Sequence, residues 1–305
     1  MEILRFLEDL RTPVLDEFFA LVTRLGEETL FILAGLVFFW CVSKKQGYYL
    51  LSVGFLGTVL NQFLKLLFRI PRPWLRDKSF TIVESARAEA TGYSFPSGHT
   101  QSAVGVFGSI ARLNHRWWVR LLCIIACVLV PLSRMWLGVH TPADVGVSIV
   151  VALVLVFLLY PLVNKAFDRP GTARLFFGSM LLLSAAYLAF VYLYPFPADT
   201  DPENLTHGIK NAYKILGCVL GLWVAYEVDA RYIRFDTRAV WWAQLLKLVL
   251  GLVPLLLIKS GLKEPLYALF AGSYLADGVR YALITLFAGC VWPLTFRFFS
   301  RCGKK

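Results

Sequence analysis

The sequence predicts an all-α polytopic membrane protein with about nine transmembrane helices and an N-terminal interfacial amphipathic helix. Hydrophobic residues make up 58% of the 305 residues and charged residues 17%, against about 45–50% and about 25% in soluble globular proteins. The apolar residues also recur in stretches near the roughly 17–25 residues that cross a bilayer. Intrinsic disorder, a coiled coil, a collagen-like rod and a small disulfide scaffold are excluded, since each needs a polar, repetitive or cysteine-rich chain.

Residues 1–25 have the pattern of a helix that lies in a membrane interface, with apolar residues at roughly helical spacing opposite a charged face. Pro13 predicts a division into two short helices, because proline removes a backbone donor from a helix interior. The apolar positions are Ile3, Leu4, Leu7, Leu10, Leu15, Phe18, Phe19, Val22 and Leu25, and the charged ones are Glu8, Asp9, Arg11, Asp16, Glu17 and Arg24.

Nine apolar stretches follow. We expect spans over residues 28–43, 47–68, 99–113, 118–133, 142–164, 175–194, 211–228, 240–258 and 277–297. The third and fourth are short and contain small or polar residues, so they are expected to pack against protein rather than lipid.

An odd number of spans places the two termini on opposite sides of the membrane. Among the plain short hairpins one side is the more basic, with Lys44 and Lys45, residues 112–120, residues 165–174 and residues 231–238. Because short cytoplasmic loops are enriched in Lys and Arg, we assign this side to the cytoplasm. The N-terminus is then outside and the C-terminus cytoplasmic, in a plasma or inner membrane, or in the endoplasmic reticulum of a eukaryote.

The net charge of +11 does not indicate a nucleic-acid partner, because the basic residues occur singly or in pairs between apolar stretches, as membrane anchors do. The six cysteines show no disulfide framework and no metal–thiolate spacing. No cluster of Asp, Glu and His has metal-ligand spacing, so we expect no metal ion and no other cofactor. The sequence leaves the oligomeric state open.

Three polar segments lie at the ends of predicted spans, where charged residues are costly and indicate function. By parity of crossings all three face the extracytoplasmic or lumenal side. They are Lys65-Leu-Leu-Phe-Arg-Ile-Pro-Arg72-Pro73, Pro96-Ser97-Gly98-His99, and Ser133-Arg134-Met-Trp-Leu-Gly-Val-His140 with Asp144 four residues on.

Together these side chains suit a phosphate site. Arg72 and Arg134 offer planar forks that hold phosphoryl oxygens, and Lys65 adds a compact cation. Ser97 and Gly98 lie where a loop becomes a helix, so free backbone N–H groups can bind an oxyanion there.

Two histidines suit a two-step phosphoryl transfer, in which one attacks phosphorus and the other protonates the departing oxygen. His140 and Asp144 are four residues apart on an expected helical turn, so the carboxylate can hold one ring nitrogen and aim the other. His140 is therefore the candidate nucleophile, and His99 the candidate acid.

Each segment alone has a structural interpretation. Arg72 fits a snorkelling anchor in a proline loop, Ser97 a helix N-cap, and His140 with Asp144 an ordinary helix pair. Their joint occurrence on one face favours a functional site. Asp277 and Arg280, beside the last span, are expected to form a structural ion pair, with a substrate or gating role left open.

The three segments resemble, in order and spacing, the signature motifs of the type 2 phosphatidic acid phosphatase superfamily. That group includes lipid phosphate phosphatases, glucose-6-phosphatase and, more distantly, vanadium haloperoxidases. The resemblance covers residues 15–165 and implies a metal-independent phosphomonoesterase with a phosphohistidine on His140. It further implies Asp144 as the partner of His140, His99 as the acid, and Lys65, Arg72, Ser97, Gly98 and Arg134 as phosphate ligands. A nine-span plan with the N-terminus outside is similar to glucose-6-phosphatase and sphingosine-phosphate phosphatases.

We therefore expect a phosphatase core with five spans over residues 1–165 and a bundle of four spans, of unknown role, over residues 166–305. The expected substrate is a lipid phosphate, either a phosphomonoester or a pyrophosphate. The motifs have an apolar and aromatic fringe with few partners for sugar hydroxyls: Phe68, Ile70, Trp74, Leu75, Phe80, Phe95, Met135, Trp136 and Leu137. Alternatives are a sugar-phosphate phosphatase, a lipid-headgroup phosphotransferase, and a non-enzymatic transporter or binder of anionic lipids.

Overall fold

The computed structural model describes residues 1–302, and all regular secondary structure in that range is helical. Contacts along the chain divide it into two compact units. The first unit comprises residues 1–33, 52–159 and 196–207, and the second comprises residues 34–51, 160–195 and 208 onward. Four of the boundaries fall within α3 (Glu28–Val37), α4 (Lys44–Phe68), α8 (Pro142–Asp168) and α10 (Pro202–Val228), and the fifth falls in the loop before α10.

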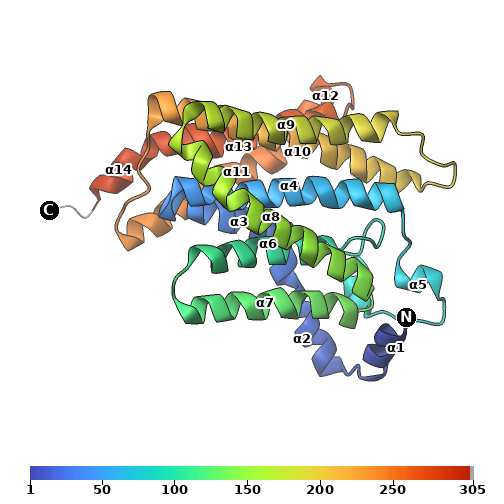
Figure 1. Ribbon diagram of the computed structural model, residues 1–305. Helices are drawn as coiled ribbons and strands as arrows, with labels where there is room; N and C mark the ends of the chain where they lie inside the picture. The colour runs from blue at the N-terminus through green and yellow to red at the C-terminus, as the bar shows by residue number, and fades with distance from the viewer. Residues whose placement is uncertain (303–305) are drawn as a thin grey trace. The chain divides into compact units, whose positions relative to one another are not determined.

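The first unit is built around a helical hairpin. α6 (Gly98–Leu113) and α7 (Trp117–Trp136) lie side by side along their lengths (Figure 1). The turn between them is closed by Asn114, whose carbonyl accepts from the Nε of Arg120 at 2.7 Å. The short helix α5 (Pro73–Arg76) and the loop after it connect α4 to α6.

The N-terminal segment packs on this hairpin. As predicted, Pro13 separates two short helices, α1 (Glu2–Asp9) and α2 (Pro13–Thr23), and the hydroxyl of Thr12 caps the second one. Leu4 and Leu7 are buried, whereas Ile3 and Phe6 on the same helix are exposed. One face of α1 is therefore held by protein, and the placement of the segment in a membrane interface stays a prediction.

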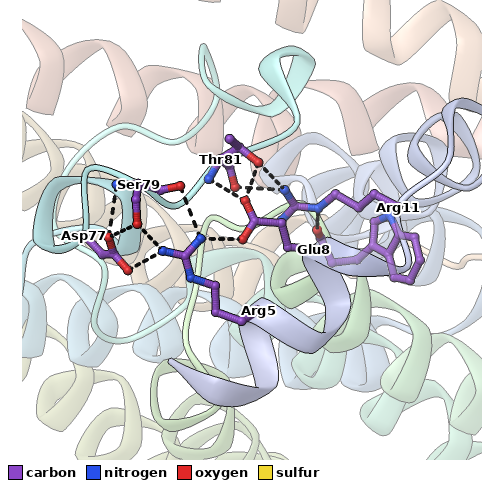
Figure 2. A network of polar contacts seen from close by, with 7 residues as sticks. Arg5, Glu8, Arg11, Asp77, Ser79 and Thr81 are labelled. Carbon is purple, nitrogen blue, oxygen red and sulfur yellow. Dashed lines mark hydrogen bonds and ion pairs between the residues drawn. The ribbon is translucent and has the colours of Figure 1, made fainter.

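A polar network fixes α1 to the loop after α5 (Figure 2). Arg5 donates to Glu8 at 2.8 Å and to Asp77 at 2.6 Å, and Glu8 accepts from the backbone N–H of Thr81 at 2.7 Å. Arg11 donates to the carbonyls of Thr81 at 2.8 Å and Trp136 at 2.9 Å. Beneath this network Leu4 packs with Phe80 and Ile82. The segment is thereby attached at both its polar and its apolar face.

The second unit is a helical bundle with three π-helical turns, at Phe38–Val42, Asp229–Ile233 and Phe287–Val291. Its other helices are α9 (Pro170–Leu193), α11 (Trp241–Gly261), α12 (Lys263–Leu269), α13 (Leu275–Leu286) and α14 (Phe296–Arg301). Asp277 and Arg280 form the expected ion pair, and Asp277 also accepts from the hydroxyl of Tyr267 at 2.6 Å.

Six helical stretches within residues 1–302 are long and apolar enough to cross a membrane, or seven if a bent pair counts as one span. That pair joins residues 13–26 to residues 28–42 at an angle of 48°. The nine spans predicted from the sequence are therefore not confirmed. The predicted span at 99–113 falls on α6, which has 16 residues. The one at 211–228 falls on α10, whose apolar stretch is interrupted by charged residues.

Candidate active site

Arg72 lies at the centre of the polar residues in the first unit. It precedes α5 as its N-cap residue, and its side chain is 4% exposed. The guanidinium donates to the carbonyls of Gly92 at 3.0 Å, Thr91 at 2.6 Å and Val139 at 2.9 Å. Its Nη1 atom also lies 2.9 Å from the Nε2 atom of His140. Four contacts thus fix the plane of this guanidinium.

The contact between Arg72 and His140 determines which ring nitrogen carries a proton. A guanidinium has no acceptor, so Nε2 of His140 is the unprotonated nitrogen and Nδ1 bears the hydrogen. Nδ1 faces Asp144, with 3.6 Å to Oδ2, and makes no hydrogen bond within the described chain. Burial, followed by the positive charges of Arg72, Arg134 and Lys65, holds the pKa of His140 well below its usual value. The imidazole is therefore neutral at neutral pH, the form that a nucleophile requires.

Asp144 is held in place by groups that the motif spacing did not indicate. Its Oδ2 atom accepts from the hydroxyl of Ser94 at 2.5 Å and from the backbone N–H of Thr141 at 2.7 Å. Its carbonyl accepts from the N–H of Ser97 at 3.2 Å. Asp144 therefore connects the segment of His140 to that of His99.

Residues 91–94 form a clamp around the site. The carbonyls of Thr91 and Gly92 bind Arg72, the carbonyl of Tyr93 accepts from Nζ of Lys65 at 2.5 Å, and the hydroxyl of Ser94 binds Asp144. Gly92 has a φ of +73°, which glycine adopts at little cost and other residues avoid. This four-residue segment thereby orients two side chains of the first motif, Lys65 and Arg72, and Asp144 of the third.

The second motif begins α6 as predicted. Ser97 is the N-cap residue, and its hydroxyl accepts from the N–H of Thr100 at 3.4 Å, while Gly98 is the first helical residue. His99 follows, with its Nε2 atom buried and without a hydrogen-bond partner in the described part of the chain. The carboxylate of Glu89 lies 3.7 Å from that atom, which is beyond hydrogen-bond distance. His99 is thus available to a reacting group.

Arg134 belongs to the third motif and is fully enclosed by protein. It lies in the last turn of α7 and is 1% exposed, and its Nη1 atom donates to the hydroxyl of Thr23 at 2.7 Å. Its carbonyl accepts from the N–H of His140 at 3.3 Å, which closes the loop between the two residues. Gly138 in this loop has a φ of +78°, and a Cβ there would lie 2.8 Å from Arg11. The positive φ favours glycine at this turn, and a Cβ there would also have to displace the end of the Arg11 side chain.

The predicted site residues thus converge in the first unit. Hydrogen bonds join Arg72 to His140 and Asp144 to Ser97, and the positive charges of Lys65 and Arg134 act on His140. No group of three or more His, Cys, Asp and Glu residues able to hold a metal ion occurs within residues 1–302. Metal independence itself stays a prediction.

The apolar fringe differs from what we expected. Phe80, Trp136 and Leu137 are buried in clusters that include Leu4 and Leu7 of α1. The N-terminal segment packs over these three side chains and buries them. The spacing of apolar residues in the sequence does not predict this packing. Phe68 and Leu75 are exposed, as a fringe requires.

Comparison with known proteins matches residues 45–168 to the PAP2 superfamily and residues 213–304 to the transmembrane extension of PAP2 superfamily phosphatases. Undecaprenyl-diphosphatase BcrC of Bacillus subtilis (strain 168) is 34% identical over 149 residues, which cover 48% of this chain and 74% of that protein. Phosphatidylglycerophosphatase B of the same organism is 30% identical over 173 residues, which cover 52% of this chain and 78% of that protein.

A third relative extends further along the chain. The probable sphingosine-1-phosphate phosphatase of Dictyostelium discoideum is 26% identical over 239 residues, which cover 74% of this chain and 57% of that protein. No solved structure matches the chain significantly. The two family matches contain the three motifs and most of the second unit, and BcrC is matched over most of its length. The chain is therefore an integral membrane protein of the PAP2 superfamily that carries the transmembrane extension of its phosphatases.

Proposed function

We propose that the protein is a lipid phosphate phosphatase that works through a phosphohistidine intermediate on His140. The observation that carries the proposal is the buried, neutral imidazole of His140, with Nε2 at 2.9 Å from Arg72 and Nδ1 facing Asp144. This arrangement supplies a nucleophile beside a cation that binds phosphoryl oxygens. The names of the relatives support the substrate class, since each describes a phosphatase of a lipid phosphate or diphosphate.

In the first step the phosphoryl oxygens are bound by Arg72, Arg134 and Lys65, by the hydroxyl of Ser97 and by the backbone N–H of Gly98 at the start of α6. Nη1 of Arg72 transfers its hydrogen bond from His140 to the substrate, which frees the Nε2 lone pair. Nε2 then attacks phosphorus, and a nitrogen–phosphorus bond forms as the bond to the lipid oxygen breaks. His99, protonated through the negative charge of the bound phosphoryl group, donates its proton to that oxygen.

In the second step water attacks the phosphohistidine, with His99 accepting the proton, and inorganic phosphate leaves as the nitrogen–phosphorus bond breaks. Asp144 stabilises the positive charge that develops on the ring of His140. The chemistry needs no metal ion, because three buried cations neutralise the phosphoryl charge.

The same proposal places the site on the extracytoplasmic or lumenal side of a nine-span bundle, with the N-terminus outside and the C-terminus cytoplasmic. Parity of the spans and the basic short loops support this orientation. The exposed apolar face of α1 and α2, which includes Ile3, Phe6, Val14, Phe18 and Leu21, supports contact of this segment with the membrane interface.

A phosphate-release panel with purified protein in detergent tests the proposal. We expect kcat/KM for a long-chain phosphatidate, sphingoid phosphate or polyprenyl diphosphate to exceed that for glucose 6-phosphate by at least about 100-fold, or roughly 2.7 kcal/mol. Equal or reversed preference would favour the sugar-phosphate alternative. Transfer to an added alcohol in place of water would identify a phosphotransferase, and binding of all these substrates without phosphate release would identify a binder.

A further inference from the structure

A residue outside the PAP2 match contacts the candidate site. Thr23 is the last residue of α2, whereas the match begins at residue 45. Its side chain is 3% exposed, and its Oγ1 atom accepts from Nη1 of Arg134 at 2.7 Å. The two residues are 111 positions apart in the chain, so this contact depends on the packing of the N-terminal segment.

Arg134 has few other means of orientation. Within the described part of the chain, Thr23 is the one hydrogen-bond partner of its side chain, and its Nε atom is buried without a partner. Arg134 forms no salt bridge within residues 1–302, and the charge of Glu89 acts on it only from beyond salt-bridge distance. Arg72, in contrast, is fixed by four contacts. The hydroxyl of Thr23 thus decides where the guanidinium of Arg134 points.

A hydroxyl is suited to this task beside a phosphate site. A carboxylate would orient the guanidinium equally well but would neutralise the charge that the substrate needs. A threonine hydroxyl accepts one hydrogen bond and leaves the full positive charge and the second Nη atom to the phosphoryl oxygens. The contact therefore positions Arg134 without competing with the substrate for its charge.

Thr23 is itself held in a fixed place by the helical hairpin. The neighbouring Val22 packs with Ala103 of α6 and Val130 of α7. Three residues after Thr23, a Cβ on Gly26 would lie 2.7 Å from the carbonyl oxygen of His99. The segment thus contacts α6, which carries His99 in its first turn, and α7, which carries Arg134 in its last turn. At its other end it is secured by the network of Arg5, Glu8 and Arg11 with the loop after α5, shown in Figure 2.

We propose that Thr23 is a positioning residue for Arg134, and that the N-terminal segment, residues 1–26, is an integral part of the phosphate site. The inference rests on the proposed role of Arg134 as a phosphate ligand. It predicts that loss of the Thr23 hydroxyl weakens the recognition of phosphoryl oxygens while Arg134 itself is present.

The test uses the full-length protein and compares Thr23→Val, which keeps the shape of the side chain, with Thr23→Ser, which keeps the hydroxyl. We expect Thr23→Val to lower kcat/KM for the lipid phosphate by about 10- to 100-fold and to raise the inhibition constant of vanadate by a similar factor, because a buried N–H loses its acceptor. Thr23→Ser should stay within about threefold of the wild type. Thr58→Val is the matched control, since the hydroxyl of Thr58 donates to the carbonyl of Gly54 in the same unit and forms no hydrogen bond with a site residue within residues 1–302.

A double-mutant cycle separates positioning from a general effect on folding. In an Arg134→Lys background the hydroxyl has no guanidinium to orient, so adding Thr23→Val should cause little further loss. Thr23→Ala is the second variant, because it removes the hydroxyl without adding a methyl group. The melting temperature of each variant is measured as well, to detect a loss of stability. Equal losses in both backgrounds, or wild-type vanadate inhibition in Thr23→Val, would overturn the inference. Full activity of Arg134→Lys and Arg134→Ala would instead contradict the proposed site.

Discussion

Nη1 of Arg72 lies 2.9 Å from Nε2 of His140 and donates to it. The same nitrogen of His140 is the proposed nucleophile, so the arginine both fixes the tautomer and covers the reactive lone pair. When a phosphoryl oxygen replaces Nε2 as the acceptor, the lone pair becomes free at the position where phosphorus then lies. Substrate binding and activation of the nucleophile are therefore coupled through one side chain.

Ser94 orients the carboxylate that faces His140, and its loss should lower catalysis. We expect Ser94→Ala to reduce kcat by about tenfold, because Oδ2 of Asp144 loses the hydroxyl that donates to it at 2.5 Å and with it one constraint on its position. Ser148→Ala is the matched control, since that hydroxyl donates to the backbone carbonyl of Asp144. Initial rates with a lipid phosphate measure both. Equal effects of the two substitutions would show that the carboxylate contact has no special role.

His99 should matter most for substrates with a poor leaving group. We expect His99→Ala to lower kcat/KM for a lipid alkyl phosphate by about 100- to 10,000-fold, the usual range for general acid–base catalysis. An aryl phosphate, whose leaving oxygen needs no proton, should lose far less. Comparison of the two substrates in the wild type and the variant measures the difference. An equal loss for both would remove His99 from the role of acid.

The pKa of His140 predicts how stability depends on pH. Because burial and the charges of Arg72, Arg134 and Lys65 lower this pKa in the folded protein, the unfolded chain binds a proton first as the pH falls below about 6.5. The free energy of unfolding should then decrease by about 1.4 kcal/mol per pH unit from this group, down to the lowered pKa. Melting temperatures between pH 8 and pH 5 measure it. His140→Asn should show a smaller decrease than the wild type, and an identical decrease would contradict the assignment.

The proposed orientation predicts which side of the membrane reacts with an impermeant thiol reagent. A cysteine introduced as Ser79→Cys, in the exposed loop after α5, should be labelled from outside in intact cells, and Cys302 should be spared. Permeabilised cells should show labelling of Cys302 and serve as the control. Labelling of Cys302 alone from outside would invert the topology.

The sequence was enough to predict which residues the fold gathers in the candidate site, whose catalytic role stays a prediction. Parity of the spans brought the three motifs to one face, and Ser97 was identified as an N-cap because a loop before an apolar helix requires one. Ser94 and Thr23 could not be found in that way. Their contacts join segments that are distant in the chain, at 50 and 111 positions from their partners, and no motif spacing encodes them.

The number of membrane spans was less predictable. The helix α6 has 16 residues and includes the polar side chains of Gln101 and Arg112, so it can cross a bilayer only with help from its neighbours. The burial of Phe80 and Trp136 by α1 likewise depends on docking of the N-terminal segment, because the same apolar residues would suit a membrane interface.

Trapping of the covalent intermediate tests the central claim most directly. Lipid phosphate labelled with radioactive phosphorus is mixed with the protein in excess chelator, the reaction is stopped with denaturant at alkaline pH, and the labelled residue is mapped. We predict a phosphoryl group on His140 that is stable in base and labile in acid, no trapped label in His140→Ala, and label retained in His99→Ala. A labelled enzyme in His140→Ala, or label mapped to another residue in the wild type, would contradict the account.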